Sequence, residues 1–214
     1  AADGHRLAAY VASPTGTPRG GLVVVQEIFG VNAHICSVAD AYAAEGYLVI
    51  APALFDRAER SVEIGYSPDE VKRGMALKAA CTDAGALQDI AAAVAHVQHA
   101  GKVGIVGYCW GGYLSWLASG SVDGLAASVP YYGGGMTDAI AEQPACPVMA
   151  HFGERDSNIP AAGVKALAAA HPSAQVFLYP ADHGFNCDQR GSYDAAAAVL
   201  ARERTLTFLR QYVG

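Results

Sequence analysis

The sequence is short of charged residues, of basic residues in particular, and of long apolar runs. Charged residues make up 16% of the 214 residues, and 14 lysines and arginines stand against 20 aspartates and glutamates, which gives a formal net charge of −6. Proteins that bind nucleic acids usually carry a basic surface that neutralises phosphates, so we expect no nucleic acid partner. No apolar run reaches the roughly 18 residues that a transmembrane helix needs, and we expect no membrane partner either.

Signals for export, for a disulfide framework and for a metal site are also missing. Residues Ala1–Arg6 lack the basic and apolar regions of a signal peptide. The five cysteines are odd in number and contain no C-x-x-C pair, which argues against a zinc motif or a disulfide scaffold. His96 and His99 share a predicted helix face without a further ligand nearby, and the other histidines, His34 among them, show no ligand spacing. We therefore expect a cytoplasmic protein with free, mostly buried thiols, no metal and no other cofactor.

Short apolar runs alternate with longer helical patterns over the whole chain, which is 52% hydrophobic. The apolar runs predict strands at Leu22–Gln26, Tyr47–Ala51, Val103–Val106, Leu125–Tyr131, Val148–Phe152 and Val176–Tyr179. The helical patterns lie at Ala33–Glu45, Gly85–His99, Trp110–Ser119, Ala161–Ala170 and Tyr193–Gln211. Continuously apolar strands are typical of a parallel sheet that is buried on both faces. We predict one α/β domain over residues 1–214, with a mostly parallel sheet and helices on both faces.

Two segments fit this alternation less well. The initial run Arg6–Ala12 is short and irregular, and we expect an edge hairpin strand there. Residues Asp56–Ala80 are more polar than their surroundings and predict an excursion over one edge of the sheet.

The most informative segment is Lys102–Gly112, in which an apolar run leads through Gly-Tyr-Cys-Trp-Gly into a helical pattern. This arrangement matches the G-x-S-x-G nucleophile elbow with Cys109 in place of serine. Small residues are needed two positions before and after the nucleophile, because the turn is too tight for side chains there. A cysteine at a helix N-terminus is favoured as a thiolate. The Trp110 amide is the natural donor to an oxyanion at the same place.

An acid and a histidine follow the cysteine in the chain order of this fold. Asp156 lies in the loop after one predicted strand, and His183 lies in the loop after the next one. Both loops reach the carboxyl edge of the sheet, where ligands and catalytic groups collect. Asp182 is a rival acid, but a residue beside the histidine in an extended segment usually points the other way. Asp156 could alternatively serve as a helix cap or a turn residue.

At these residues the chain resembles the dienelactone hydrolase family, the carboxymethylenebutenolidases of the α/β-hydrolase superfamily. The resemblance runs from about Gly4 to Leu209. It rests on the motifs at Gln26–Asn32, Gly107–Gly112, Gly153–Pro160, His183–Phe185 and Glu203–Leu206.

The resemblance implies a Cys-His-Asp triad that opens enol-lactone rings through an acyl-thioester intermediate. Cys109 would be the nucleophile, His183 the general base and then the acid, and Asp156 the group that orients the imidazole. The Ile28 amide matches the second oxyanion donor, and Glu27 matches a glutamate that helps to generate the thiolate. A glutamate at the end of an apolar strand also needs a partner on physical grounds, so a purely structural pairing of Glu27 with an arginine or an amide is the alternative.

The chain departs from the family where its members bind the substrate carboxylate. An arginine four residues after the histidine is replaced by Cys187, and Arg190 follows three residues later. Lys72 and Arg73 stand near the position of a second family arginine, slightly out of register. We expect Lys72, Arg73 and Arg190 to bind a substrate carboxylate, with ordinary solvated surface charge as the alternative.

Our hypothesis from the sequence is therefore a cofactor-free hydrolase of a small-molecule ester or lactone of the dienelactone type, acting as a monomer or a small homo-oligomer. One alternative keeps the triad for another ester, thioester or lactone. A second alternative makes Cys109 a redox-sensing thiol, although redox sensing does not require a histidine–aspartate pair.

Overall fold

The computed structural model describes residues 1–214 and contains one sheet of seven strands. The strands are β1 (Ala9–Ala12), β2 (Gly21–Val25), β3 (Leu48–Pro52), β4 (Val103–Tyr108), β5 (Leu125–Tyr131), β6 (Met149–Gly153) and β7 (Gln175–Tyr179). Their order across the sheet is β1-β3-β2-β4-β5-β6-β7. Every neighbouring pair from β3 to β7 is parallel, so the carboxyl ends of these strands meet at one edge. The predicted α/β architecture is confirmed.

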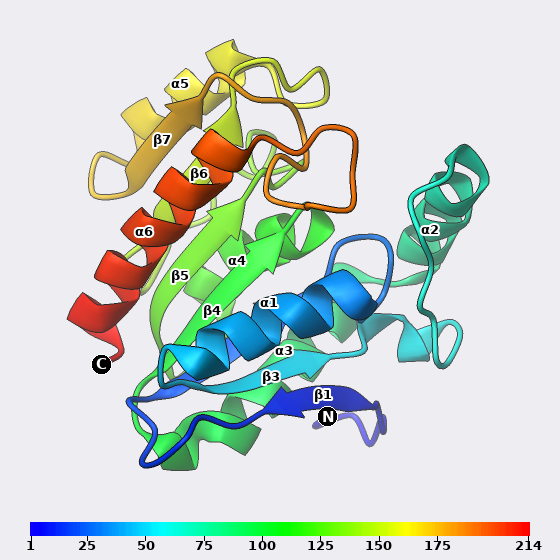
Figure 1. Ribbon diagram of the computed structural model, residues 1–214, viewed down its shortest axis with the longest axis vertical. Helices are drawn as coiled ribbons and strands as arrows, with labels where there is room; N and C mark the ends of the chain where they lie inside the picture. Colours follow the sequence, from blue (N-terminus) through cyan, green and yellow to red (C-terminus); the bar gives the residue numbers. More distant parts are fainter.

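Helices cover both faces of the sheet (Figure 1). They are α1 (Ala33–Ala44), α2 (Pro68–Ala80), α3 (Asp83–Val97), α4 (Trp110–Ser121), α5 (Ala161–Ala170) and α6 (Ala195–Tyr212), with short 3-10 turns η1 (Leu54–Arg57) and η2 (Gln98–Ala100). Helices α1 and α6 lie in front of the sheet in Figure 1, and α3 and α4 lie behind it. The buried apolar residues form two clusters, of 35 and 21 residues, because the sheet separates the two faces. No helix has both the length and the apolar character needed to cross a membrane.

The structure differs in detail from the two predictions made for the edges of the sheet. The first strand is an edge strand as predicted, but it pairs antiparallel with β3 and not with its sequence neighbour β2, so it forms no hairpin. The excursion at Asp56–Ala80 contains the second half of η1 and the whole of α2, which projects away from the layers (Figure 1). Helix α2 begins with a capping box between Ser67 and Glu70, which satisfies amide groups that the helix cannot satisfy itself.

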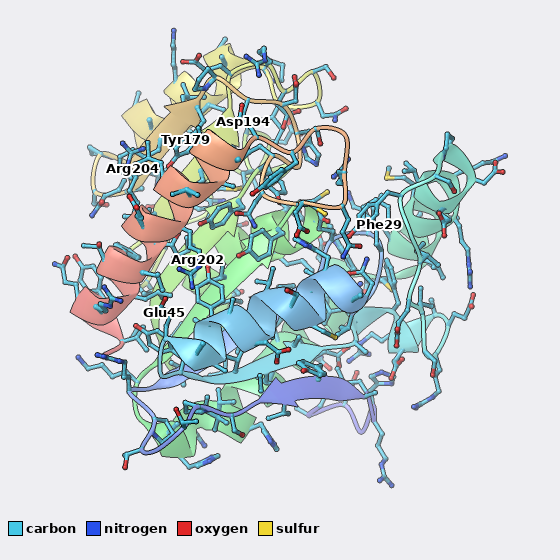
Figure 2. The ribbon with its side chains drawn as sticks, in the orientation of Figure 1. Phe29, Glu45, Tyr179, Asp194, Arg202 and Arg204 are labelled. Atoms are coloured by element: carbon cyan, nitrogen blue, oxygen red, sulfur yellow. The ribbon has the colours of Figure 1, made fainter.

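Helix α6 is attached to the rest of the front layer by arginines. Arg202 and Arg210 each donate to the Glu45 carboxylate at 3.0 Å, which joins α6 to the end of α1 (Figure 2). Arg204 donates to the Tyr179 hydroxyl at 3.1 Å and lies over the Phe177 ring. These contacts hold α6 in place, and with it the end of the loop that joins β7 to α6.

The excursion is tied to the rear layer by a buried ion pair. Arg57, in η1, donates through Nε and Nη2 to the two carboxylate oxygens of Asp89, both at 2.7 Å. The Asp89 side chain is completely buried. A bidentate arginine offsets the cost of burying this carboxylate, so the pair holds η1 on α3.

We predict that Arg57→Ala lowers the free energy of unfolding by about 3–5 kcal/mol, because it leaves the buried Asp89 carboxylate unpaired. Arg73→Ala is the matched control. Arg73 pairs with Glu59, but both side chains are about half exposed, and exposed pairs contribute about 0–1 kcal/mol. Urea denaturation of both variants measures the difference. Equal losses would show that burial of Asp89 does not set the strength of the pair.

Candidate active site

Cys109 sits at the turn between β4 and α4 in a strained backbone conformation. Its φ is 54° and its ψ is −114°, a combination that is costly for a residue other than glycine. The turn is possible because α4 approaches the sheet very closely. A Cβ atom at Gly107 would lie 1.9 Å from the Gly111 carbonyl oxygen, and one at Gly111 would lie 2.4 Å from the Val25 carbonyl oxygen. The two glycines of the motif therefore have the steric role that the sequence predicts.

Three side chains from separate loops meet at this turn. The His183 Nε2 atom lies 3.2 Å from Cys109 Sγ, and His183 Nδ1 lies 2.7 Å from Asp156 Oδ2. The other Asp156 oxygen accepts from the Asn158 amide at 2.8 Å. Asp182, the rival acid, is half exposed and faces Arg155 instead. The structure thus brings Cys109, Asp156 and His183 into one hydrogen-bonded chain.

The electrostatics of this chain favour a proton on the imidazole. Burial alone would lower the pKa of His183, but its hydrogen bonds with Asp156 and with Cys109 outweigh burial and raise the pKa to about 10. Asp156 is buried and accepts from both the imidazole and a backbone amide. An imidazolium beside a sulfur atom favours a thiolate at that atom.

The first residue of α4 and the loop after β2 carry the two predicted oxyanion donors, Trp110 and Ile28. Trp110 is the first residue of α4, so its N–H has no acceptor within the helix. The Ile28 N–H donates to no acceptor in the chain. Ile28 is held in place by α2, where a Cβ at Gly74 would lie 2.1 Å from the Ile28 carbonyl oxygen. Both predicted oxyanion donors therefore have amides free for a ligand.

Glu27 is buried at the end of β2 and is only partly paired. Its Oε1 lies 3.4 Å from Arg190 Nη1, and its Oε2 has no hydrogen-bond partner. Burial, together with nearby charge at Glu27, Cys187 and Cys109, raises the pKa of Tyr132 well above its ordinary value. The Tyr132 ring lies 5.2 Å from the His183 ring, and its buried hydroxyl is unpaired. Tyr132 belongs to no recognisable motif, although its place directly after β5, at the carboxyl edge of the sheet, is a usable signal in the sequence.

The three basic residues that we expected to act together are not brought together. Arg190 lies against Glu27 and packs over the Phe29 ring, 5.6 Å from its centroid. Arg73 pairs with Glu59, and Lys72 is exposed on α2. The expectation of mostly buried cysteines is wrong, because only Cys187 is buried and the other four are half-buried.

A mostly parallel sheet with a strained cysteine after β4, and with an acid and a histidine after β6 and β7, defines an α/β hydrolase. The chain belongs to the dienelactone hydrolase family, whose profile matches residues 7–213. It is 36% identical to the carboxymethylenebutenolidase of Pseudomonas putida, over 97% of this chain and 92% of that protein.

Solved structures agree with this assignment. A Klebsiella pneumoniae protein titled "Putative Dienelactone Hydrolase" superposes with a TM-score of 0.84 at 34% identity, covering 98% of this chain and 95% of that one. A dienelactone hydrolase-like promiscuous phosphotriesterase from metagenomic libraries has a TM-score of 0.74 at 21% identity, covering 97% and 99% of the two chains, and shows the same fold. The chain is therefore a hydrolase, which sets aside the redox-sensor alternative.

The raised pKa of His183 predicts a pH-dependent contribution to stability. A histidine whose pKa rises from 6.5 to about 10 on folding stabilises the fold fully below pH 6.5, and this contribution is lost as the pH rises through 10. Asp156→Asn removes one cause of the rise, and one pKa unit corresponds to about 1.4 kcal/mol. We expect Asp156→Asn to lower the free energy of unfolding by about 2 kcal/mol at pH 6.5 and by less as the pH approaches 10. Urea denaturation at the two pH values measures this difference. Asp182→Asn is the control, and a loss in Asp156→Asn that is the same at both pH values would contradict the prediction.

Proposed function

We propose that the chain acts as one α/β-hydrolase domain, over residues 1–214, that opens an enol-lactone ring by nucleophilic catalysis. Cys109 is the nucleophile, His183 the general base and acid, and Asp156 the residue that orients the imidazole. The observation that carries the proposal is the continuous chain of contacts from Asp156 through His183 to Cys109 Sγ at the strained turn. The family of the chain supports the substrate class, since its Pseudomonas putida relative is named a carboxymethylenebutenolidase.

The first half of the reaction forms a thioester. The Cys109 thiolate attacks the lactone carbonyl carbon, and a new C–S bond forms while the carbonyl oxygen becomes an oxyanion. The Ile28 and Trp110 amides stabilise this oxyanion. As the ring C–O bond breaks, the enol oxygen leaves and takes its proton from the His183 imidazolium. An enol oxygen is a stabilised leaving group, which suits a thiol nucleophile better than an amide nitrogen would.

The second half of the reaction regenerates the enzyme. His183, now neutral, removes a proton from a water molecule that attacks the thioester carbonyl, and the same two amides stabilise the second oxyanion. The C–S bond then breaks, the carboxylic acid product leaves, and the Cys109 thiolate and the His183 imidazolium are restored. Asp156 holds the imidazole in the tautomer that both steps need.

Glu27 assists the nucleophile in this proposal. A carboxylate beside the cysteine can accept the thiol proton and help to generate the thiolate when substrate binds. Its burial and its unpaired Oε2 support this role. The pairing of Oε1 with Arg190 supports the structural alternative in part, but it leaves the second oxygen unexplained.

A broader specificity is the second candidate function. Of the three basic residues expected to bind a substrate carboxylate, only Arg190 lies beside the proposed site, and it already pairs with Glu27. A site with one arginine that is already paired with a carboxylate selects an anionic substrate less strongly than a site with two unpaired arginines. This favours activity toward other esters, thioesters or lactones through the same triad.

The triad predicts a ranking of variants. Cys109→Ala should lower the rate of hydrolysis by several orders of magnitude because the covalent nucleophile is lost. Cys109→Ser should retain a small part of the wild-type rate. Asp156→Asn should lower kcat by up to about 10⁴-fold, because the imidazole then prefers the wrong tautomer. Asp182→Asn should have little effect. Steady-state rates with an enol-lactone and an aryl ester measure all four variants.

Circular dichroism and urea denaturation of each variant control for loss of the fold. A Cys109→Ala protein that keeps most of the wild-type turnover would overturn the assignment of Cys109 as the nucleophile. A larger fall in kcat for Asp182→Asn than for Asp156→Asn would overturn the assignment of Asp156 as the acid of the triad.

The charge of the preferred substrate is tested with Arg190→Gln. We expect kcat/KM to fall roughly 10–100-fold more for an anionic lactone than for its neutral methyl ester, since a charged hydrogen bond contributes about 1.5–3 kcal/mol. Any damage from leaving Glu27 unpaired affects both substrates, so the ratio isolates the carboxylate contact. Lys72→Gln, on the exposed face of α2, is the matched control. Equal losses for the two substrates in Arg190→Gln would favour the broader esterase.

A further inference from the structure

Beside the proposed active site, three buried side chains with metal-binding chemistry face one another. Glu27, His34 and Cys187 each offer one ligand atom, and these atoms all lie within 4.8 Å of one another. The exposed fractions of the three residues are 1%, 4% and 0%. Glu27 follows β2, His34 lies in the first turn of α1, and Cys187 lies in the loop after β7. The sequence shows no ligand spacing here because the loop after β7 brings the distant Cys187 to Glu27 and His34.

The hydrogen bonds around this group leave two acceptors unsatisfied. His34 Nδ1 lies 3.2 Å from Asp188 Oδ1, and a carboxylate can only accept, so Nδ1 carries the proton. In the neutral imidazole, His34 Nε2 is then a bare lone pair. It is buried without a partner, as is Oε2 of Glu27. Buried acceptors of this kind are costly unless a positive or proton-donating group lies beside them.

We propose that Glu27, His34 and Cys187 form a binding site for a borderline-soft divalent cation of the Zn²⁺ type. Thiolate, imidazole and carboxylate are the three ligand types that Zn²⁺ takes, at about 2.0–2.3 Å from the metal. Ligand atoms around such an ion lie roughly 3.3–3.8 Å apart. A separation of up to 4.8 Å therefore needs rotamer adjustments of about 1 Å. A water molecule would complete the tetrahedron.

The groups around the site suit a cation. Histidine ligands usually donate their second ring N–H to a carboxylate, which is the arrangement of His34 with Asp188. Arg190 lies against Oε1 of Glu27, so Oε2 is the oxygen that would face the metal. With the thiol ionised, the three positive charges of the metal and Arg190 balance the three negative charges of Glu27, Cys187 and Asp188.

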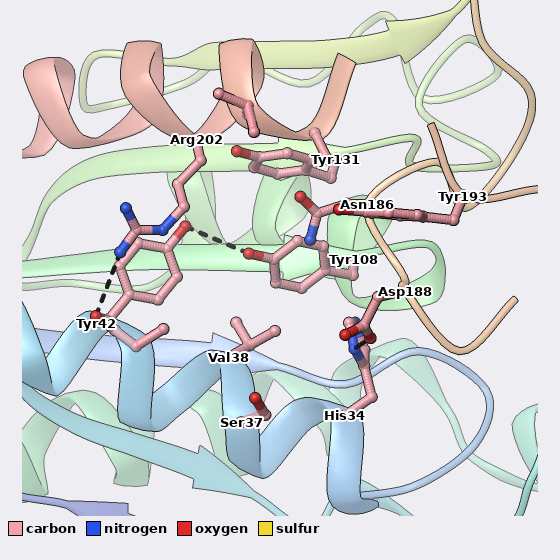
Figure 3. A pocket seen from close by; sticks show the side chains of 13 residues that line it. His34, Ser37, Val38, Tyr42, Tyr108, Tyr131, Asn186, Asp188, Tyr193 and Arg202 are labelled. Carbon is pink, nitrogen blue, oxygen red and sulfur yellow. Dashed lines mark hydrogen bonds and ion pairs between the residues drawn. The ribbon is translucent and has the colours of Figure 1, made fainter. Parts of the chain in front are cut away.

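An entry route leads to His34 from the front of the molecule. A cavity of about 210 Å³ lies between α1 and α6, and His34 and Asp188 are among the residues that line it. Figure 3 shows the pair side by side at one end of this cavity, beneath the loop after β7. The Asp188 side chain is 67% exposed, whereas the His34 side chain is 5% exposed. A hydrated cation could therefore meet Asp188 first and lose its water on moving to the buried ligands.

Binding at this site displaces a proton. A thiol must lose its proton to bind a metal ion. Formation of the metal–sulfur bond releases that proton to solvent, with no oxidation or reduction.

Occupancy would also affect catalysis, an inference that rests on the proposed function. A metal ion on Oε2 would hold Glu27 in place and occupy the oxygen that is otherwise free to assist Cys109. The cation is therefore expected to inhibit the hydrolase reversibly.

Direct binding is tested with Co²⁺ as the spectroscopic probe. The full chain carries Cys109→Ala, so that the thiol beside His183 cannot bind the probe. We expect one equivalent of Co²⁺ to produce a near-ultraviolet thiolate-to-metal band together with intense tetrahedral d–d bands. Adding Cys187→Ser should abolish the near-ultraviolet band, and Cys36→Ser is the matched thiol control that should keep it. Asp188→Asn, on an exposed carboxyl group, should weaken binding about 10–100-fold without risk to the core.

A band that survives Cys187→Ser, or binding that is unchanged in Asp188→Asn, overturns the site. Absence of any band in the Cys109→Ala chain also overturns the site. A water molecule would then be the partner of the two buried acceptors.

The inhibitory role is tested separately with Zn²⁺ and the chain that retains Cys109, each variant being compared with its own metal-free rate. Inhibition that a chelator reverses and that Cys187→Ser relieves supports the role. Inhibition of equal strength in Cys187→Ser overturns the role and assigns the effect to Cys109 and His183. Because the Co²⁺ experiment does not depend on turnover, failure of the proposed function would leave its result intact.

Discussion

The close approach of α4 to the sheet is the constraint on which the rest of this site depends. Gly107 and Gly111 allow the helix backbone to lie almost against β2 and β4, and the chain between them must then turn so sharply that Cys109 adopts a positive φ. The cost of that conformation is offset by the packing of α4, including the stacking of Trp110 on Phe55. The strain has a chemical result, because it presents the sulfur atom at the carboxyl edge with free amide groups beside it.

The parallel sheet supplies the other groups through the same geometry. Since β2, β4, β6 and β7 end at one edge, the loops that follow them carry Ile28, Cys109, Asp156 and His183 to that edge. No single loop contains the site. Its precision depends on the buried network behind it, in which His151 joins Tyr179 and Thr205 between β6, β7 and α6.

Much of this could be read from the sequence, and the failures have identifiable causes. Buried parallel strands are continuously apolar, so their positions and the chain order of Cys109, Asp156 and His183 were predictable. The pairing of β1 was not, because an edge strand of four residues carries almost no pattern. The directions of Lys72 and Arg73 depend on the rotation of α2, which projects from the layers and packs on the core only through a narrow face formed by Val71, Gly74 and Leu77.

Glu27 shows why the remaining part of the site could not be predicted from motifs. A carboxylate at the end of a buried strand must be balanced by positive charge or by donors, but several groups can supply them. In this chain Arg190 lies 3.4 Å from Oε1, and His34 and Cys187 each place a ligand atom within 4.8 Å of a Glu27 carboxylate oxygen. Oε2 has no hydrogen-bond partner. The ion pair is therefore open, with a carboxylate oxygen that a proton, a thiol or a cation can share.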